Sequence, residues 1–478
     1  MSSSLQAITS SLRWISAAKL AGQLVNWAIT FMVLRLLSPS DYGMMAMATV
    51  FVSFISMFAD MGLGVAVIQS KQCSRERLSE IFGAVLLLNI SLSVLLALLA
   101  APIANFYDEP RLTDVLRVLS LQFTIAAFSA MPRAWLQREM RFKAFSAIEV
   151  SGALLTGLTT LVLAWMGYGV WSLVLGNMVG IVWPALLANW LAPLKVWPSF
   201  RFAESAEMLK VGRNVTTSRV LWYFMSQADV FIVGKLLGKE LLGFYSVAIQ
   251  LSSMPMSKVM SIVNQVALSG FARIQDDRAA VRQGVLQGVT VIAFIAFPLF
   301  WGMSSVAAEL VTVVLGDRWQ QAVLPLQLIP LVIPLRMVSV YMSTAVQGIG
   351  RSDVDVRNTF QGALVMPLAF LIGCQWGLMG VCLAWILVIP LLYLSNIRRL
   401  LLTMEIAPRE FLRALAQPVA IAALMYLAVF SMHGLLQPLI PALPLLLAQA
   451  AAGALVYAGI YWIFARDSAL QVMRFVKG

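Results

Sequence analysis

Long apolar runs, separated by short polar segments, follow one another along the whole chain. Many of these runs reach about twenty residues, which as an α-helix is enough to cross the ~30 Å hydrocarbon core of a bilayer. The alternation of apolar and polar residues that is typical of membrane-spanning strands is absent. The sequence therefore predicts an all-α polytopic membrane protein with about fourteen transmembrane helices. We expect them near 12–36, 42–68, 82–104, 113–134, 143–166, 169–192, 211–237, 241–268, 284–307, 323–348, 354–375, 378–402, 410–432 and 444–465.

Two features depart from this picture of straight helices and tight loops. The tenth predicted helix contains Pro325, Pro330 and Pro334. Because proline lacks an amide donor and its ring clashes with the preceding turn, we expect that helix to be kinked or broken. The longest loops on the less charged side are expected near 105–112, 308–322 and 433–443.

Lysine and arginine are distributed unequally between the two sides of the predicted helices. Most of the 34 Lys and Arg residues lie in alternate loops. Cytoplasmic loops of membrane proteins carry an excess of these residues, so both termini are predicted to be cytoplasmic. Basic residues that orient the protein in the membrane thus account for most of the net charge of +12. Since no soluble basic domain is predicted, we expect no binding of nucleic acid.

Composition narrows the chemistry further. The chain is 60% hydrophobic and 12% charged, and it has one histidine, His433, and three cysteines. These residues cannot supply a metal-ligand cluster, so neither a metal nor another cofactor is expected. Cys374 and Cys382 flank one tight turn, and we expect them to be free, apolar thiols.

The first half of the chain resembles the second. Residues 33–48 read VLRLLSPSDYGMMAMA and residues 233–248 read VGKLLGKELLGFYSVA, at an offset of 200. A second match, at an offset near 210, pairs Arg141 with Arg351. Because six helices is an even number, the two halves would share one orientation, as in a parallel repeat. We therefore predict lobes of six helices at 1–195 and 196–403, and two further helices with a tail at 404–478.

Polar side chains recur at helical spacing inside several predicted helices. Lys19, Gln23 and Asn26 share one face of the first helix, and Ser246, Gln250 and Asn264 lie along the eighth. Stripes made of serine and threonine favour contacts between helices. Stripes that also hold charged or amide residues favour a hydrated cavity between the two halves, because charge in hydrocarbon costs ~2.5–3.5 kcal/mol per group.

Two sets of candidate site residues follow from these stripes. Arg336 is added because it lies mid-helix beside two prolines, where a broken helix can bind an anion. The predicted substrate-binding residues are Lys19, Gln23, Asn26, Arg219, Tyr223, Gln250, Asn264 and Arg336. The predicted candidates for ion or proton coupling are Asp60, Glu149 and Asp229, of which Glu149 and Asp229 could equally be partners in salt bridges.

Several stretches, in this order, resemble a known family. They read LSPSDYGMMAMA (37–48), FADMGLGVAVIQ (58–69), LQREMRFKAFSAIEV (136–150), ADVFIVGKLLG (228–238), NQVALSGFARIQDD (264–277), GDRWQQAVLPLQ (316–327) and QGIGRSD (347–353). With them the chain resembles the Wzx-type polysaccharide flippases of the multidrug/oligosaccharidyl-lipid/polysaccharide exporter superfamily, especially the branch of colanic-acid exporters. The last two helices carry no such motif.

The resemblance implies a fold and a function. The fold would be two six-helix lobes around a cationic central cavity, with two additional helices. The function would be transport of an undecaprenyl-pyrophosphate-linked oligosaccharide across the bacterial inner membrane by alternating access, for exopolysaccharide or lipopolysaccharide biosynthesis. Membrane lipids, a polysaccharide polymerase and a chain-length regulator would be its partners.

Three other functions remain open at this point. A peptidoglycan-precursor flippase would need similar chemistry. A multidrug/ion antiporter of the same superfamily would favour acidic cavities, whereas cations outnumber acids within these predicted helices. A membrane polymerase, ligase or glycosyltransferase would need a large external loop with catalytic residues, which the sequence does not contain, so we expect no enzyme.

Overall fold

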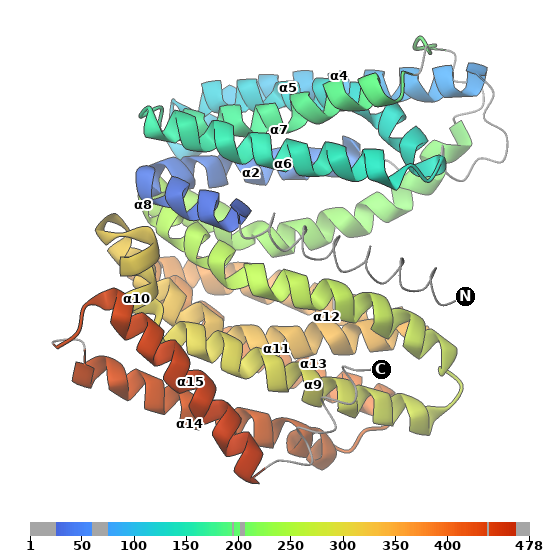
Figure 1. The fold of residues 1–478 in the computed structure, drawn as a ribbon. Coiled ribbons are helices and arrows are strands. Elements are labelled where there is room, and N and C mark those ends of the chain that lie inside the picture. The colour runs from blue at the N-terminus through green and yellow to red at the C-terminus, as the bar shows by residue number, and fades with distance from the viewer. Residues whose placement is uncertain (1–24, 60–74, 194–195, 201–205, 437–438, 465–478) are drawn as a thin grey trace, which may run out of the picture. The chain divides into compact units, whose positions relative to one another are not determined.

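The computed structural model describes residues 25–59, 75–193, 196–200, 206–436 and 439–464, except for the side chains of 206–222 and of a few other helical positions, Lys258 among them. Within these ranges helices account for the regular structure, and no strand occurs (Figure 1). The all-α class is therefore confirmed. The helices of the first part are α2 (Pro39–Ala59), α4 (Arg75–Tyr107), α5 (Leu112–Arg138), α6 (Phe142–Trp165) and α7 (Val170–Leu191).

The remaining elements begin with the long helix α8 (Ala206–Arg273). They continue with α9 (Arg278–Ser305), α10 (Ala307–Leu310), η1 (Val311–Leu315), η2 (Asp317–Ala322), α11 (Val323–Gly348), α12 (Ser352–Gly373), η3 (Cys374–Trp376), α13 (Gly377–Thr403), α14 (Pro408–Leu436) and α15 (Ala442–Phe464).

Ten segments of the described chain are long and apolar enough to cross a membrane. One of them, 352–403, holds both α12 and α13. The polytopic character is thus confirmed, although this criterion does not reach the expected fourteen. Because a bilayer offers no water to backbone amides and carbonyls, only structures that pair these groups internally can span it, and the helix does so within one segment.

Two segments differ from the expected local structure. The tenth predicted helix is not broken, because Pro330 and Pro334 lie inside α11, which runs from 323 to 348. The segment 308–322, expected as a loop, forms the short helices α10, η1 and η2, and Trp319 within it is fully buried. The break expected between 211–237 and 241–268 is confirmed, because α8 consists of two helices that meet at the non-helical Gly238, where φ is +81°.

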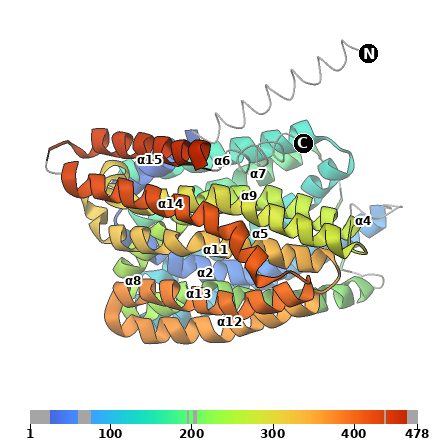
Figure 2. The ribbon, with the colours of Figure 1, turned by 90° about the horizontal axis from the view of Figure 1, so that it is seen from below.

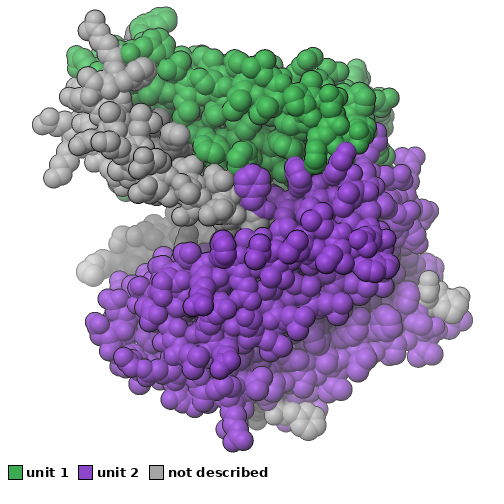
Figure 3. Space-filling view, turned by 180° about the vertical axis from the view of Figure 1, so that it is seen from behind, with its two compact units in different colours: residues 1–223 green, residues 224–478 purple. Residues whose placement is uncertain are grey.

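The chain divides into two compact units, residues 1–223 and 224–478, coloured separately in Figure 3. The division falls within α8, so one helical segment contributes to both units. The predicted lobe boundary at 195 and 196, and that at 403 and 404, stay predictions.

The repeat seen in the sequence recurs in the geometry of one turn within each unit. Met140 and Gly350, at the offset of 210, both have positive φ, +55° and +77°. In each turn the next residue donates its amide hydrogen to the carbonyl oxygen five positions earlier: Arg141 to Leu136 at 2.9 Å and Arg351 to Val346 at 3.0 Å. This pattern closes a helix C-terminus with a left-handed residue, and it ends α5 and α11 in the same way.

The last two helices belong to the second unit and lie side by side in Figures 1 and 2. Met425 and Val429 of α14 are buried against Val306, with Leu446 and Tyr457 of α15 around them. The Tyr457 hydroxyl also donates a hydrogen bond to the Phe294 carbonyl of α9, at 2.8 Å. These contacts fasten α14 and α15 to the core of that unit.

The turn between α12 and α13 depends on two glycines that face each other. A Cβ atom at Gly380 would lie far inside van der Waals contact with the Gly373 carbonyl oxygen, which is backbone and cannot rotate away. The expected result of Gly380→Ala is a loss of about 1–3 kcal/mol of stability, as for other overpacked sites. Thermal unfolding of the purified protein in detergent measures this loss.

Gly459→Ala is the matched control, because a Cβ atom there meets nothing within 4 Å among the described residues. Its melting temperature should equal or exceed that of the unmodified protein, since alanine favours a helix. Equal melting temperatures for the two variants would contradict the close approach at Gly380.

Candidate functional site

A chain of polar side chains crosses the interior of the second unit. Asp229 and Tyr245, both on α8, are joined by a hydrogen bond of 2.7 Å from the tyrosine hydroxyl to the carboxylate. The indole Nε1 of Trp385 on α13 donates to the same hydroxyl oxygen at 2.7 Å. Asp229 is only 6% exposed and Tyr245 is fully buried. In this environment each polar atom needs its partner, because an unpaired buried group costs its full desolvation energy.

Arg336 of α11 completes this chain by lying over the ring of the same indole. Its guanidinium carbon lies 4.7 Å from the centroid of the Trp385 ring, a distance typical of a cation–π contact. Among the described residues it forms no ion pair. Its positive charge nevertheless attracts the negative charge of the Asp229 carboxylate across the network. We call Asp229, Tyr245, Trp385 and Arg336 the interior network.

The network joins three helices that are far apart in the sequence. Tyr245 and Trp385 are separated by 140 residues, and their hydrogen bond links α8 to α13. α11 packs against α13, which brings Arg336 to the indole. Chemically, the arrangement holds a guanidinium inside a membrane-spanning segment beside a carboxylate and an aromatic face. Such a group can accept an anion in exchange for its indole contact.

The other predicted binding residues of the second unit lie outside this network. Asn264 of α8 accepts a hydrogen bond from the Thr344 hydroxyl of α11 at 3.1 Å, which is an interhelical contact. Gln250, on the same helix, is exposed. The structure therefore brings Asp229 and Arg336 into one network and leaves Gln250 and Asn264 apart from it.

The predicted residues of the first unit fall into three groups. Tyr223 is buried, and its hydroxyl donates to the Val50 carbonyl of α2. Asn26 is partly buried at the start of the described chain. Lys19, Gln23 and Asp60 lie outside the described residues, as does the side chain of Arg219.

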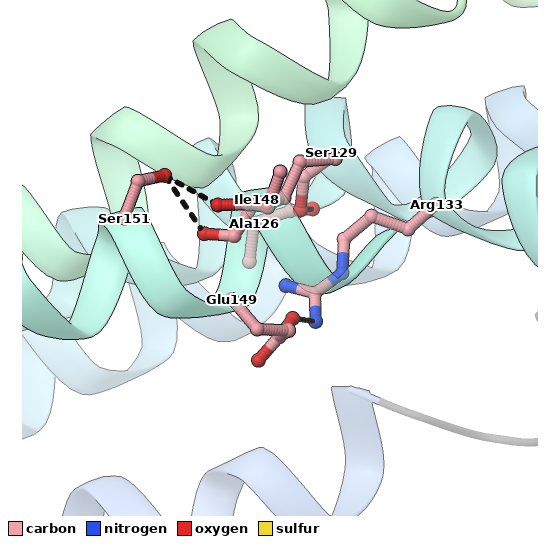
Figure 4. A network of polar contacts seen from close by, with 7 residues as sticks. Ala126, Ser129, Arg133, Ile148, Glu149 and Ser151 are labelled. Carbon is pink, nitrogen blue, oxygen red and sulfur yellow. Dashed lines mark hydrogen bonds and ion pairs between the residues drawn. The ribbon is translucent and has the colours of Figure 1, made fainter. Parts of the chain in front are cut away.

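Glu149 on α6 points toward Arg133 on α5, and the two form an ion pair (Figure 4). The arginine also lies 5.5 Å from the ring centroid of Phe145. The side chain of Glu149 is 48% exposed and that of Arg133 is 34% exposed. Of the two interpretations that the sequence left open for Glu149, this geometry favours the salt bridge.

Two residues of the interior network, Tyr245 and Trp385, are absent from the predicted site. Both lie in apolar runs where an aromatic residue is ordinary. The sequence holds one signal for Tyr245, which adjoins the polar stripe that begins at Ser246. Trp385 carries no such signal, because its role arises only from the packing of α13 on α11.

A cavity of about 470 Å³ lies in the first unit between α4, α5, α7 and the segment after α7. Its lining is mostly apolar and includes Phe82, Phe128 and Trp197, with Asn189 as its amide side chain. It contains none of the predicted site residues. It is therefore distinct from the interior network, which belongs to the second unit.

The comparison with protein families decides where the chain belongs. The family described as "Polysaccharide biosynthesis protein" matches residues 32–324, which is more than half of the chain. The chain belongs to this polysaccharide biosynthesis protein family. That range includes α2 to α10 together with the Asp229 and Tyr245 members of the interior network.

Relatives in this family cover most of the chain. It is 27% identical over 358 residues to the lipopolysaccharide biosynthesis protein WzxC of Escherichia coli (strain K12), covering 74% of this chain and 73% of that protein. It is 26% identical over 443 residues to the teichuronic acid biosynthesis protein TuaB of Bacillus subtilis (strain 168), covering 90% of each. The resemblance to exopolysaccharide exporters is thereby confirmed.

A solved structure shares the fold. The lipid II flippase MurJ, in an inward closed conformation, superimposes with a TM-score of 0.71 and covers 95% of this chain and 98% of its own. At 16% identity this likeness concerns the fold alone. The family thus places the chain in polysaccharide biosynthesis, and its fold is that of a membrane flippase.

The interior network predicts coupled effects of substitution. Tyr245→Phe removes the donor to Asp229 and the acceptor of Trp385 together, so we expect a loss of about 1–3 kcal/mol in stability. Trp385→Phe should cost less when it is added to Tyr245→Phe than by itself, because the shared hydrogen bond is already gone. The four proteins of this double-mutant cycle can be compared by thermal unfolding.

Tyr426→Phe serves as the control, since its hydroxyl has no hydrogen bond to another described residue and its ring stacks on Phe430. Its free energy of unfolding should lie within about 1 kcal/mol of that of the unmodified protein. Additive losses for Tyr245→Phe and Trp385→Phe would contradict the network.

Proposed function

We propose that the protein moves an undecaprenyl-pyrophosphate-linked oligosaccharide repeat unit from the cytoplasmic to the periplasmic leaflet of the bacterial inner membrane. The observation that carries this proposal is Arg336, whose guanidinium carbon lies 4.7 Å from the centroid of the Trp385 ring in the interior of the second unit. A membrane-embedded cation of this kind suits the pyrophosphate of a lipid-linked sugar.

Each part of such a substrate needs a different environment. The polyprenyl tail can stay in the bilayer, where it loses no hydrophobic contact. The pyrophosphate loses water on entering the protein, and arginine replaces that water with two parallel hydrogen bonds. The sugar hydroxyls require amide and hydroxyl groups, for which Gln23, Asn26, Tyr223, Gln250 and Asn264 are our candidates. Lys19 and Arg219 are the proposed additional cations.

The proposed movement is alternating access, with one lobe rocking against the other around a central site. Asp229 is our first candidate for coupling to an ion or proton, because it is buried and shares the network with Arg336. Asp60 remains a second candidate. Glu149 ranks behind both, since Arg133 neutralises its charge.

The proposed setting follows from the same chemistry. Both termini would lie in the cytoplasm, where the excess of lysine and arginine is expected. A polysaccharide polymerase and a chain-length regulator are proposed partners, because the exported unit must be polymerised on the far side of the membrane.

Arg336→Ala should leave the protein in the membrane and reduce polysaccharide export at least tenfold, since a charge-assisted hydrogen bond contributes about 1.5–3 kcal/mol. Arg336→Lys should retain part of the export because it keeps the charge but loses the paired hydrogen bonds. We would measure surface polysaccharide in a strain that lacks the chromosomal gene, and protein level by immunoblotting of membranes. Lys19→Ala combined with Arg219→Ala should behave like Arg336→Ala.

Arg318→Ala is the matched control, because Arg318 is an exposed arginine of the same unit. It should export normally. Full export by Arg336→Ala at normal protein level would overturn the assignment. Export of lipid-linked peptidoglycan precursor, or proton-driven efflux of cationic drugs, by the reconstituted protein would instead favour the two related transporter functions.

A further inference from the structure

A second buried polar cluster lies in the same unit, away from the interior network. Glu309 is on the four-residue helix α10 and is only 3% exposed. The His433 Nδ1 atom of α14 lies 2.6 Å from its Oε1 atom, and the Gln449 Nε2 atom of α15 donates to the same oxygen at 2.9 Å. The three side chains thus join three helices at one carboxylate oxygen.

The cluster has more acceptors than donors. Both contacts end on Oε1 of Glu309, while its Oε2 atom is buried without a hydrogen bond to a described residue. The Oε1 atom of Gln449 is buried and unpaired in the same way, and that residue is fully buried. A buried polar atom without a partner is costly. What the cluster lacks is therefore a donor, and one added proton supplies it.

The described elements packed around the cluster supply no cation to compensate the charge of Glu309. Of the elements packed on α10, α15 presents the amide of Gln449, and α9 ends there with the hydroxyls of Ser304 and Ser305. η1 has no ionisable residue, and the single charged residue of α11 is Arg336 of the interior network. His433 is thus the titratable group that faces Glu309. With a neutral imidazole the cluster carries one uncompensated negative charge.

We propose that Glu309, His433 and Gln449 form a binding site for one proton. The proton is shared between the carboxylate and the imidazole, and its uptake converts a buried site of net charge −1 into a neutral one. His433 is 25% exposed and provides the route by which the proton reaches the site. The ligand class is a proton rather than a metal ion, because no group of three or more histidine, cysteine or acidic residues gathers here among the described residues.

The proton strengthens the contact that fastens α14 and α15 to the second unit. A buried charge is stabilised only when it is paired, so the unprotonated cluster weakens its three-helix contact. If the folded protein binds this proton more tightly than the unfolded chain does, the stability contributed by the site is present at low pH and is lost as pH rises. This inference concerns the stability of the second unit and does not depend on the proposed substrate.

The test is the melting temperature of the purified full-length protein, measured at intervals from about pH 5.5 to about pH 8.5, the range in which histidine chemistry operates. The unmodified protein should lose several degrees as pH rises. Glu309→Gln should remove most of this dependence, because the amide is neutral at every pH. Glu410→Gln, on α14 and paired with Arg282 near the other end of the helix, is the control and should keep the dependence.

His433→Asn provides a second variant if Glu309→Gln does not reach the membrane. Without the imidazole the proposed site is incomplete, so this variant should also lose most of the pH dependence. A pH dependence that is the same in the unmodified protein and in these variants would overturn the proposal. The proposal would also be overturned if sodium ions raised the melting temperature at constant pH and Glu309→Gln abolished this effect, because the bound cation would then be sodium.

Discussion

Everything in this structure follows from the absence of water in the hydrocarbon core of a bilayer. The backbone responds by forming helices, which pair every amide and carbonyl within one segment. Polar side chains face the same constraint and must find partners inside the protein. Asp229, Tyr245 and Trp385 do so through two hydrogen bonds of 2.7 Å, and Arg336 does so through the face of the indole. The site that we propose for an anion is thus also a structural contact.

One turn has the same geometry in each of the two units. Met140 and Gly350 close corresponding helices with the same left-handed turn, although one of them has a side chain that disfavours it. The turn is therefore set by the hydrogen bonds that end α5 and α11, rather than by the residue type alone.

The last two helices had no role in the sequence, and the structure gives them a structural one. They pack on α9 through Met425 and Val429, and through the hydrogen bond from Tyr457 to Phe294. The cluster at Glu309 adds a polar contact to this apolar one. The apolar contact does not depend on pH, whereas the contact at Glu309 would do so through the proton site that we propose.

The sequence by itself determined the class of the protein, because the length of an apolar run and the scarcity of charge are local properties. It also identified Asp229 and Arg336, since a charged residue in such a run is conspicuous. Tertiary structure alone decided their partners: Tyr245 and Trp385 are ordinary aromatic residues until α8 packs on α13. It likewise buried Glu309, which the sequence placed in a loop, because burial there depends on helices more than a hundred residues away. Pairing in a water-free interior is a property of packed helices, and no single helix encodes it.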